Sequence, residues 1–180
     1  FKNGENARIE IRSKYYKSSV LDITYKFKVT NEGDVPGYVN KVIDYLPDDV
    51  EVVLNASPGW YIGQDDNLYY TGLVDEEIGA GEKKEFKLVL RKSLANGEAA
   101  KLTNSAEIVE YTNMLGLYDR DSIENNKEEQ EDDFGKAILM ISVSTGNTKQ
   151  IIVTALMIII IAAITTMVII KLKNTKRIYR

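Results

Sequence analysis

The densest group of side chains that could bind a metal ion lies in residues 119–133. Eight carboxylates stand there against only Arg120 and Lys127, which leaves a net charge of −6 over fifteen residues. Repulsion among so many like charges destabilises a loop unless cations gather around it. Carboxylate and amide oxygens at close spacing are the ligands that Ca²⁺ prefers. The segment therefore predicts either a solvated acidic loop or a calcium loop, whose ligands would be Asp119, Asp121, Asn125, Glu131, Asp132 and Asp133.

A second candidate chemistry is an intramolecular isopeptide bond between a lysine and Asn104, with Asp44 as the carboxyl catalyst. Such a bond needs all three side chains inside a core, where burial raises the pKa of the carboxyl and lowers that of the amine. Alternation places Asp44 and Asn104 on the apolar faces of their strands. Lys26 and Lys28 face the other way in theirs, unless a bulge shifts the register. The alternative is that Asp44 and Asn104 hydrogen-bond to turn backbone.

The composition excludes several classes of enzyme. The chain has no cysteine and no histidine, so zinc sites, Cys–His or Ser–His nucleophiles and imidazole acid–base chemistry are excluded. No glycine-rich loop follows a strand and opens a helix, so there is no phosphate cradle. Neighbouring carboxylates such as Asp48 and Asp49 point to opposite faces and make a poor acid–base pair. We expect no enzymatic activity and no cofactor other than Ca²⁺.

Period-two alternation of apolar and polar residues dominates residues 7–143. The clearest segments are 23–29, 86–90, 102–108 and 137–143, and shorter strands are predicted at 8–12, 39–46, 50–55 and 67–72. Turns rich in Gly, Pro, Asn and Asp separate them. The pattern predicts an all-β fold, an antiparallel Greek-key β-sandwich of about 7–9 strands over residues 18–144. Trp60, Tyr69 and Tyr70 would fill its core or, alternatively, form a sugar-binding platform.

The order of several short motifs resembles a known family. The motifs are ITYKFKVTNEG (23–33), VIDYLP (42–47), AGE (80–82), LTNSAEI (102–108) and DRDS (119–122). Together they resemble the Ig-like "conserved repeat" domain (domain of unknown function eleven) of bacterial, Gram-positive-type cell-surface proteins. The resemblance covers residues 18–143, and it implies an Ig-like structural or adhesive module without enzymatic activity. Such modules often occur in tandem and often stand last before the anchor.

A single apolar segment predicts where the chain is located. Ile151 to Ile170 are twenty consecutive uncharged and mostly aliphatic residues. As a helix they would extend ~30 Å, the thickness of the hydrocarbon core of a bilayer. The tail 171–180 follows with five cationic residues, beginning with Lys171 and Lys173, and no acidic one. The positive-inside rule therefore predicts a single-pass transmembrane helix with a basic, cytoplasmic C-terminus.

The remainder of the chain would then lie outside the cell. Residues 1–150 carry all 27 acidic residues and 18 of the 23 basic ones, a net charge of −9 that argues against a nucleic-acid partner. Phe1 begins the sequence, and residues 1–17 contain no apolar run typical of a secretion signal. We therefore interpret 1–17 as a strand or linker from a longer exported protein, and 145–150 as a juxtamembrane linker. Thr145 and Gly146 match only part of a cell-wall sorting signal, so we expect a retained anchor.

These features predict a non-catalytic surface module. The leading hypothesis is a stalk or spacer that holds upstream domains of the same chain away from the bilayer. The alternative is an adhesin domain, stabilised by Ca²⁺, that binds a host ligand or a cell-wall polymer through its own loops. Burial of Trp60 would favour the stalk, whereas exposed aromatics around Trp60 and Tyr69 would favour the adhesin.

Overall fold

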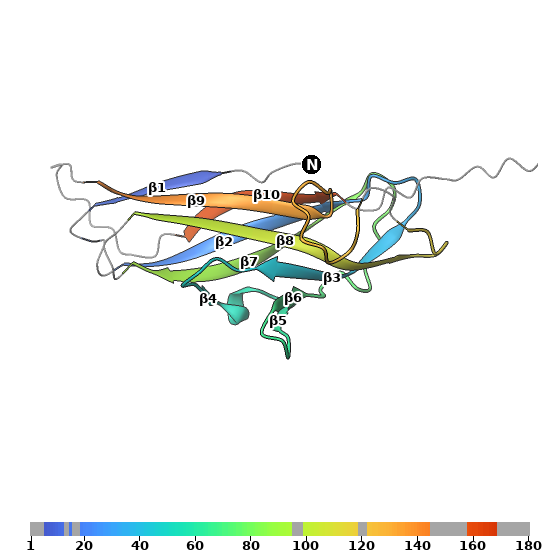
Figure 1. Ribbon diagram of the computed structural model, residues 1–180, viewed down its shortest axis with the longest axis horizontal. Coiled ribbons are helices and arrows are strands. Elements are labelled where there is room, and N and C mark those ends of the chain that lie inside the picture. Colours follow the sequence, from blue (N-terminus) through green and yellow to red (C-terminus); the bar gives the residue numbers. More distant parts are fainter. Residues whose placement is uncertain are drawn as a thin grey trace, which may run out of the picture.

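The described residues form an all-β domain of two sheets. The structure, a computed structural model, describes residues 6–12, 15, 19–94, 99–118 and 122–144, and the backbone of 158–168. The two sheets pack face to face, and their long strands run along the long axis of the domain (Figure 1). The elements are β1 (Ala7–Arg12), β2 (Val20–Thr30), β3 (Gly37–Tyr45), β4 (Glu51–Val52), a 3₁₀ helix η1 (Leu54–Ala56), β5 (Trp60–Ile62), β6 (Leu68–Tyr70), β7 (Lys83–Ser93), β8 (Ala100–Asn113), β9 (Phe134–Ser144) and β10 (Ile158–Val168). The predicted all-β class is confirmed.

The strand order shows which segments lie side by side. The larger sheet has the order β1-β9-β8-β3-β6-β5, and the smaller has the order β10-β2-β7-β4. All pairs are antiparallel except β1 with β9 and β10 with β2. β1 lies within the segment predicted as a strand or linker, and it forms an edge of the larger sheet. β5 was not predicted, because three residues between two turns are too few to show a period.

Alternating side chains of the long strands build the core. In β2, Ile23, Tyr25 and Phe27 are each at most 1% exposed, whereas the intervening Lys26 is exposed. Leu88 of β7 and Ile108 of β8 are also fully buried. Each such aliphatic or aromatic side chain contributes roughly 1.5–3 kcal/mol when it leaves water. Alternation makes one face of each strand apolar, and burial of these faces against each other holds the two sheets together.

Four aromatic rings form a cluster at one side of this core. Phe86 stacks on Phe27 at 5.0 Å and on Tyr70 at 4.0 Å between ring centroids, and Trp60 lies 5.2 Å from Tyr70. The indole Nε1 of Trp60 donates a hydrogen bond to the backbone oxygen of Lys87 at 2.8 Å. Trp60 and Tyr70 are each only 6% exposed. Both rings therefore fill the core and do not form a sugar-binding platform.

Gly59 allows the chain to pass closely over this aromatic cluster. Its φ is +83°, in the left-handed region that favours glycine. A Cβ at this position would lie 2.6 Å from Cε2 of Tyr70. The turn 57–59 needs glycine for both reasons.

Asn31 organises the turns at one end of the sandwich, where β2 ends and β3 begins. Its Nδ2 donates to the backbone oxygens of Val35 (2.9 Å) and Ile78 (2.8 Å), and its Oδ1 accepts from the backbone N–H of Gly33 (2.9 Å). The residue is 1% exposed. A single amide side chain therefore satisfies three backbone groups of two loops that are distant in sequence.

Replacing Asn31 by alanine should destabilise the domain measurably. Loss of the amide removes this donor from the backbone oxygen of Val35 and leaves that of Ile78 with only the N–H of Gly37, so we expect the free energy of unfolding to fall by about 2–3 kcal/mol. Chemical denaturation followed by circular dichroism would measure this. Asn67→Ala is the matched control, because Asn67 is exposed and bonds mainly to the side chain of Asp65. An Asn31 variant as stable as the Asn67 variant would contradict the assignment.

The C-terminal segment is described only in part. The predicted span begins and ends outside the described residues, at 151–157 and 169–170, and its basic tail lies outside them too. Ile158–Val168 form β10, which pairs in parallel with the outer edge of β2. β-branched residues such as Ile, Val and Thr have high strand propensity, and that edge offers backbone partners. No helix among the described residues has the length and apolar character needed to cross a bilayer.

Candidate functional site

The described part of the acidic segment folds back over the outer face of the larger sheet. It follows β8 and precedes β9, so it lies at the end of the sandwich opposite to Ser144, where β9 ends (Figure 1). Its contact with the sheet is centred on Glu107 of β8. This side chain is fully buried, although it belongs to the outward-facing set of its strand.

Glu107 holds the loop through three different donors. Its carboxylate accepts hydrogen bonds from the hydroxyl of Tyr45 (2.6 Å), the backbone N–H of Asn126 (2.8 Å) and the backbone N–H of Lys127 (3.2 Å). Lys127 also places its Nζ 4.2 Å from the centre of the Tyr45 ring, and the ring of Phe134 stacks on that of Tyr45 with 6.2 Å between the centroids. Burial, followed by the bond to Glu107, raises the pKa of Tyr45, so this hydroxyl remains a donor at neutral pH. Glu107 is therefore the anchor of the loop.

The predicted calcium ligands are only partly described. Asp119 and Asp121 lie outside the described residues. Glu131 uses its Oε2 to accept from the backbone N–H of Ile123 (2.8 Å) and from Nδ2 of Asn126 (3.0 Å), so it serves the loop itself. Asn125 has a left-handed backbone (φ 60°), Asp132 is half-buried and Asp133 is buried. Within the described ranges no three acidic side chains are grouped so that they could hold an ion. The calcium loop stays a prediction.

The structure brings Asp44 and Asn104 together in the core. Nδ2 of Asn104 donates to Oδ2 of Asp44 at 2.7 Å, and the two residues are 3% and 2% exposed. Burial raises the pKa of Asp44 to about 8, and the bond from Asn104 lowers it only in part. Tyr25 of β2 lies within electrostatic reach of this pair, because its pKa is raised by burial and by the charge of Asp44. The partner of Asp44 is thus an amide side chain rather than turn backbone.

The cross-link hypothesis lacks its amine in the described part of the chain. No lysine there is buried, and Lys26 is exposed. Tyr25 occupies the inward-facing position beside it. The isopeptide bond remains a prediction, and intact-mass spectrometry would test it through a loss of ~17 Da.

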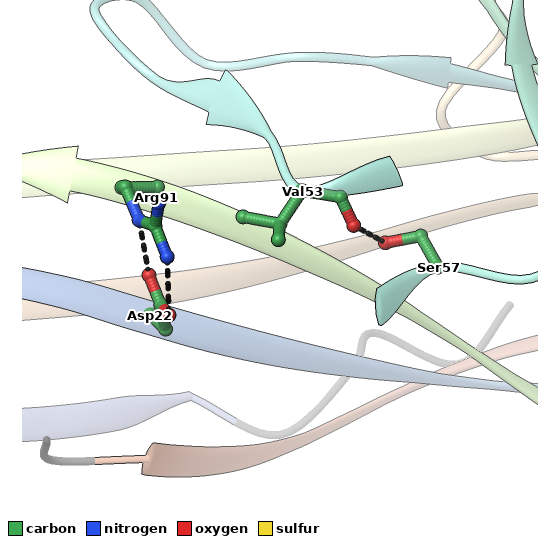
Figure 2. Close-up of polar contacts among 4 residues, drawn as sticks. All are labelled: Asp22, Val53, Ser57 and Arg91. Carbon is green, nitrogen blue, oxygen red and sulfur yellow. Dashed lines mark hydrogen bonds and ion pairs between the residues drawn. The ribbon is translucent and has the colours of Figure 1, made fainter. Parts of the chain in front are cut away.

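Two polar contacts stabilise the smaller sheet and the segment that follows β4 (Figure 2). Arg91 of β7 and Asp22 of β2 form a forked pair, with Nε to Oδ1 at 2.7 Å and Nη2 to Oδ2 at 2.8 Å. This bond lowers the pKa of Asp22. Beside it, the hydroxyl of Ser57 donates to the backbone oxygen of Val53 and accepts from the backbone N–H of Val89, each at 2.9 Å. Both arrangements are structural, since neither leaves an uncommitted nucleophile.

The hollows on the described surface contain little that could bind a ligand. One, of about 470 Å³, is floored by Tyr70 and Phe86, but Tyr70 is almost completely buried. Among the described residues the exposed aromatic side chains are Tyr118, which is 86% exposed, and Tyr61 on β5, and the neighbouring Tyr69 on β6 is half-buried. The hydroxyl of Tyr69 is bonded to Asp65 at 2.8 Å. The rings of Tyr61 and Tyr69 lie 5.8 Å apart between centroids, so they form a small exposed aromatic pair, whereas Trp60 and Tyr70 are buried.

Comparisons with known proteins add no family assignment. No protein-family model matches the chain, and no curated protein matches its sequence significantly. The class that the described residues define is an all-β, two-sheet domain.

Two residues of these sites were not predicted from the sequence. Alternation predicts that Glu107 faces outward into solvent, and it cannot show that a loop will cover this residue and bury it. The sequence predicts Tyr25 as an ordinary core aromatic residue, although its hydroxyl lies near Asp44. One signal was available for Glu107: its nearest neighbours on the outer face of the strand, Ser105 and Val109, carry no charge that could pair with it.

Proposed function

We propose that this chain is a non-catalytic, membrane-anchored surface module, a stalk or spacer that displays upstream domains of a larger exported protein. The proposal rests mainly on one observation, the twenty apolar residues of Ile151–Ile170 followed by five cationic residues. This arrangement supports a single membrane crossing with a cytoplasmic C-terminus. The acidic N-terminal part would then face the surroundings of a bacterial, Gram-positive-type cell.

The placement of β9 supports this reading. β9 ends at Ser144, six residues before the apolar segment. Six extended residues span at most about 20 Å, so the sandwich would stand close to the bilayer. β1 and β9 run in the same direction, so the chain enters β1 from the side that faces away from Ser144. Upstream domains would therefore be held on the side away from the membrane.

The order of the strands supports an Ig-like assignment for the sandwich. The chain changes from one sheet to the other after β1, β2, β3, β4, β6, β7 and β9. Repeated crossing between two mainly antiparallel sheets is typical of Greek-key sandwiches. The resemblance to the "conserved repeat" domain agrees with this order, and the burial of Trp60 and Tyr70 favours a stalk over an adhesin.

Residues 158–168 cannot form strand β10 and part of a transmembrane helix at the same time. In water, pairing with β2 satisfies the backbone of Ile158–Val168 on one side. In lipid, a helix satisfies every backbone group internally, and each Ile or Val at its centre adds roughly −0.3 to −0.6 kcal/mol of insertion free energy. We therefore propose that the helix is the form adopted in the bilayer.

Charges placed in the middle of the segment test the anchor. Replacing Ile160 and Ile161 by lysine should raise the insertion free energy by roughly 2.5–3.5 kcal/mol for each residue. We expect the wild-type chain to remain in the membrane fraction after alkaline carbonate extraction and the double variant to appear in the supernatant. Ile160→Leu with Ile161→Leu is the matched control and should stay with the membrane. Extraction of the wild-type chain itself would refute the anchor.

A further inference from the structure

Three polar side chains from three strands meet in the apolar core. They are Tyr25 of β2, Asp44 of β3 and Asn104 of β8, and they are 1%, 3% and 2% exposed. One hydrogen bond is formed among them, from Nδ2 of Asn104 to Oδ2 of Asp44 at 2.7 Å. In the described part of the chain three oxygens of this group have no hydrogen-bond partner: Oδ1 of Asp44, Oδ1 of Asn104 and the hydroxyl of Tyr25.

The chemistry of the two Oδ1 atoms indicates which protonation state fits this site. If Asp44 is ionised, both of these oxygens are acceptors and neither can satisfy the other. An ionised carboxylate without a cation is also strongly disfavoured in an apolar core. A proton on Oδ1 of Asp44 turns one of the two acceptors into a donor. The acid and the amide can then bond to each other reciprocally, each giving one hydrogen bond and accepting one.

We propose that Asp44 is a neutral carboxylic acid in the folded domain and forms a reciprocal acid–amide pair with Asn104, a proton-operated lock between β3 and β8 that opens in alkaline solution. Loss of the proton removes the second hydrogen bond and leaves a buried charge between the sheets. The lock therefore makes the stability of the domain depend on external pH. This inference concerns the sandwich alone and does not depend on membrane anchoring.

Among the described residues, no charged group around Asp44 could replace the proton. Tyr25 of β2 is the titratable side chain whose pKa responds to Asp44, and burial keeps it neutral. From β6 the inward-facing residues are Leu68 and Tyr70, and burial raises the pKa of Tyr70 to about 12. The buried residues that β7, β8 and β9 turn toward the core are apolar apart from Asn104, and they include Leu88, Leu102, Ala106, Ile108, Leu139 and Ile141. The sequence of β10 contains no titratable residue.

The direction of the pH effect follows from linkage. Burial raises the pKa of Asp44 to about 8, against about 3.9 for an aspartate in an unfolded chain. Between these values the folded state binds one proton more than the unfolded state, so stability falls as pH rises. The folding equilibrium constant should lose up to about tenfold per pH unit in this window. Below it the lock is fully formed, and above about pH 8 the loss is complete.

The variant Asp44→Asn distinguishes the pH dependence caused by the acid–amide lock from that caused by other titratable groups. The new amide supplies an N–H to Oδ1 of Asn104 at every pH, so both hydrogen bonds persist. We expect urea denaturation of the full chain in detergent micelles to give a midpoint that falls from pH 5 to pH 9 in the wild type and stays nearly constant in Asp44→Asn. Asp65→Asn is the matched control, since Asp65 is exposed and should leave the wild-type dependence unchanged. An Asp44→Asn profile that parallels the wild type would overturn the proposal.

A second measurement on the wild type keeps the proposal testable if the variant does not fold. Carbon-detected NMR can follow the side-chain carboxyl of Asp44 through a pH titration of the full chain in micelles. We expect its midpoint near 8, far above that of exposed aspartates. A midpoint below pH 5 would show that Asp44 is ionised in the folded domain at neutral pH and would refute the proposal.

Discussion

Replacing Trp60 by alanine is expected to lower the free energy of unfolding by about 3–5 kcal/mol, the usual range for loss of a large buried aromatic. Trp60 lies between Phe27, Tyr70 and Phe86 in the aromatic cluster, so its removal leaves a cavity that three rigid rings cannot close. The backbone oxygen of Lys87 loses its indole donor as well. Since whole domains have only about 5–15 kcal/mol of stability, this variant should be close to unfolded at 37 °C.

Thermal unfolding followed by circular dichroism would measure the effect, because Trp60 is the only tryptophan and the variant loses its fluorescence signal. Tyr61→Ala is the matched control, as Tyr61 is the next residue in β5 but is 41% exposed. We expect that control to change stability by less than about 1 kcal/mol. If Trp60→Ala were no less stable than Tyr61→Ala, the aromatic cluster would not be a central part of the core.

Replacing Glu107 by alanine is expected to detach the acidic loop. The hydroxyl of Tyr45 and the backbone N–H groups of Asn126 and Lys127 all lose their acceptor. Each buried donor without a partner costs about 1–3 kcal/mol, but the loop can rehydrate as it lifts away. We therefore expect a loss of roughly 2–4 kcal/mol in unfolding free energy, together with faster hydrogen exchange at Asn126 and Lys127.

Hydrogen-exchange mass spectrometry of the loop peptides would measure the detachment directly. Glu110→Ala is the control on the same strand, because Glu110 forms an exposed ion pair with Lys41 at 3.3 Å and accepts no hydrogen bond from Asn126 or Lys127. Exposed pairs contribute about 0–1 kcal/mol, so its loop should exchange as slowly as in the wild type. Equal protection of the loop in both variants would mean that Glu107 is not its anchor.

The sequence predicted best what depends on local periodicity. Long alternating runs such as those in β2 and β8 showed both the strands and their buried faces, and the same parity placed Asp44 and Asn104 in the core. β5 was missed because three residues cannot show a period of two. The pairing of β1 with β9 joins residues more than 130 positions apart, and alternation carries no information about partners.

The sites were harder to predict, because they depend on contacts between distant segments. Glu107 is polar on an outer face, and only the return of the loop about twenty residues later buries it. Tyr25 shares its face with Ile23 and Phe27, so nothing local distinguishes its hydroxyl from that of any core tyrosine. The proximity of Asp44 to Asn104 required two strands, sixty residues apart, to pair in one register.

The absence of native cysteine makes the topology of the chain directly measurable. Met114→Cys introduces a thiol at a position that is 82% exposed in the sandwich, and Thr175→Cys introduces one in the basic tail. In intact cells that express the full-length chain, a membrane-impermeant maleimide should label the cysteine at position 114 at once. It should label the cysteine at position 175 only after the membrane is permeabilised. Labelling of position 175 in intact cells, or protection of position 114, would contradict an anchored module displayed at the cell surface.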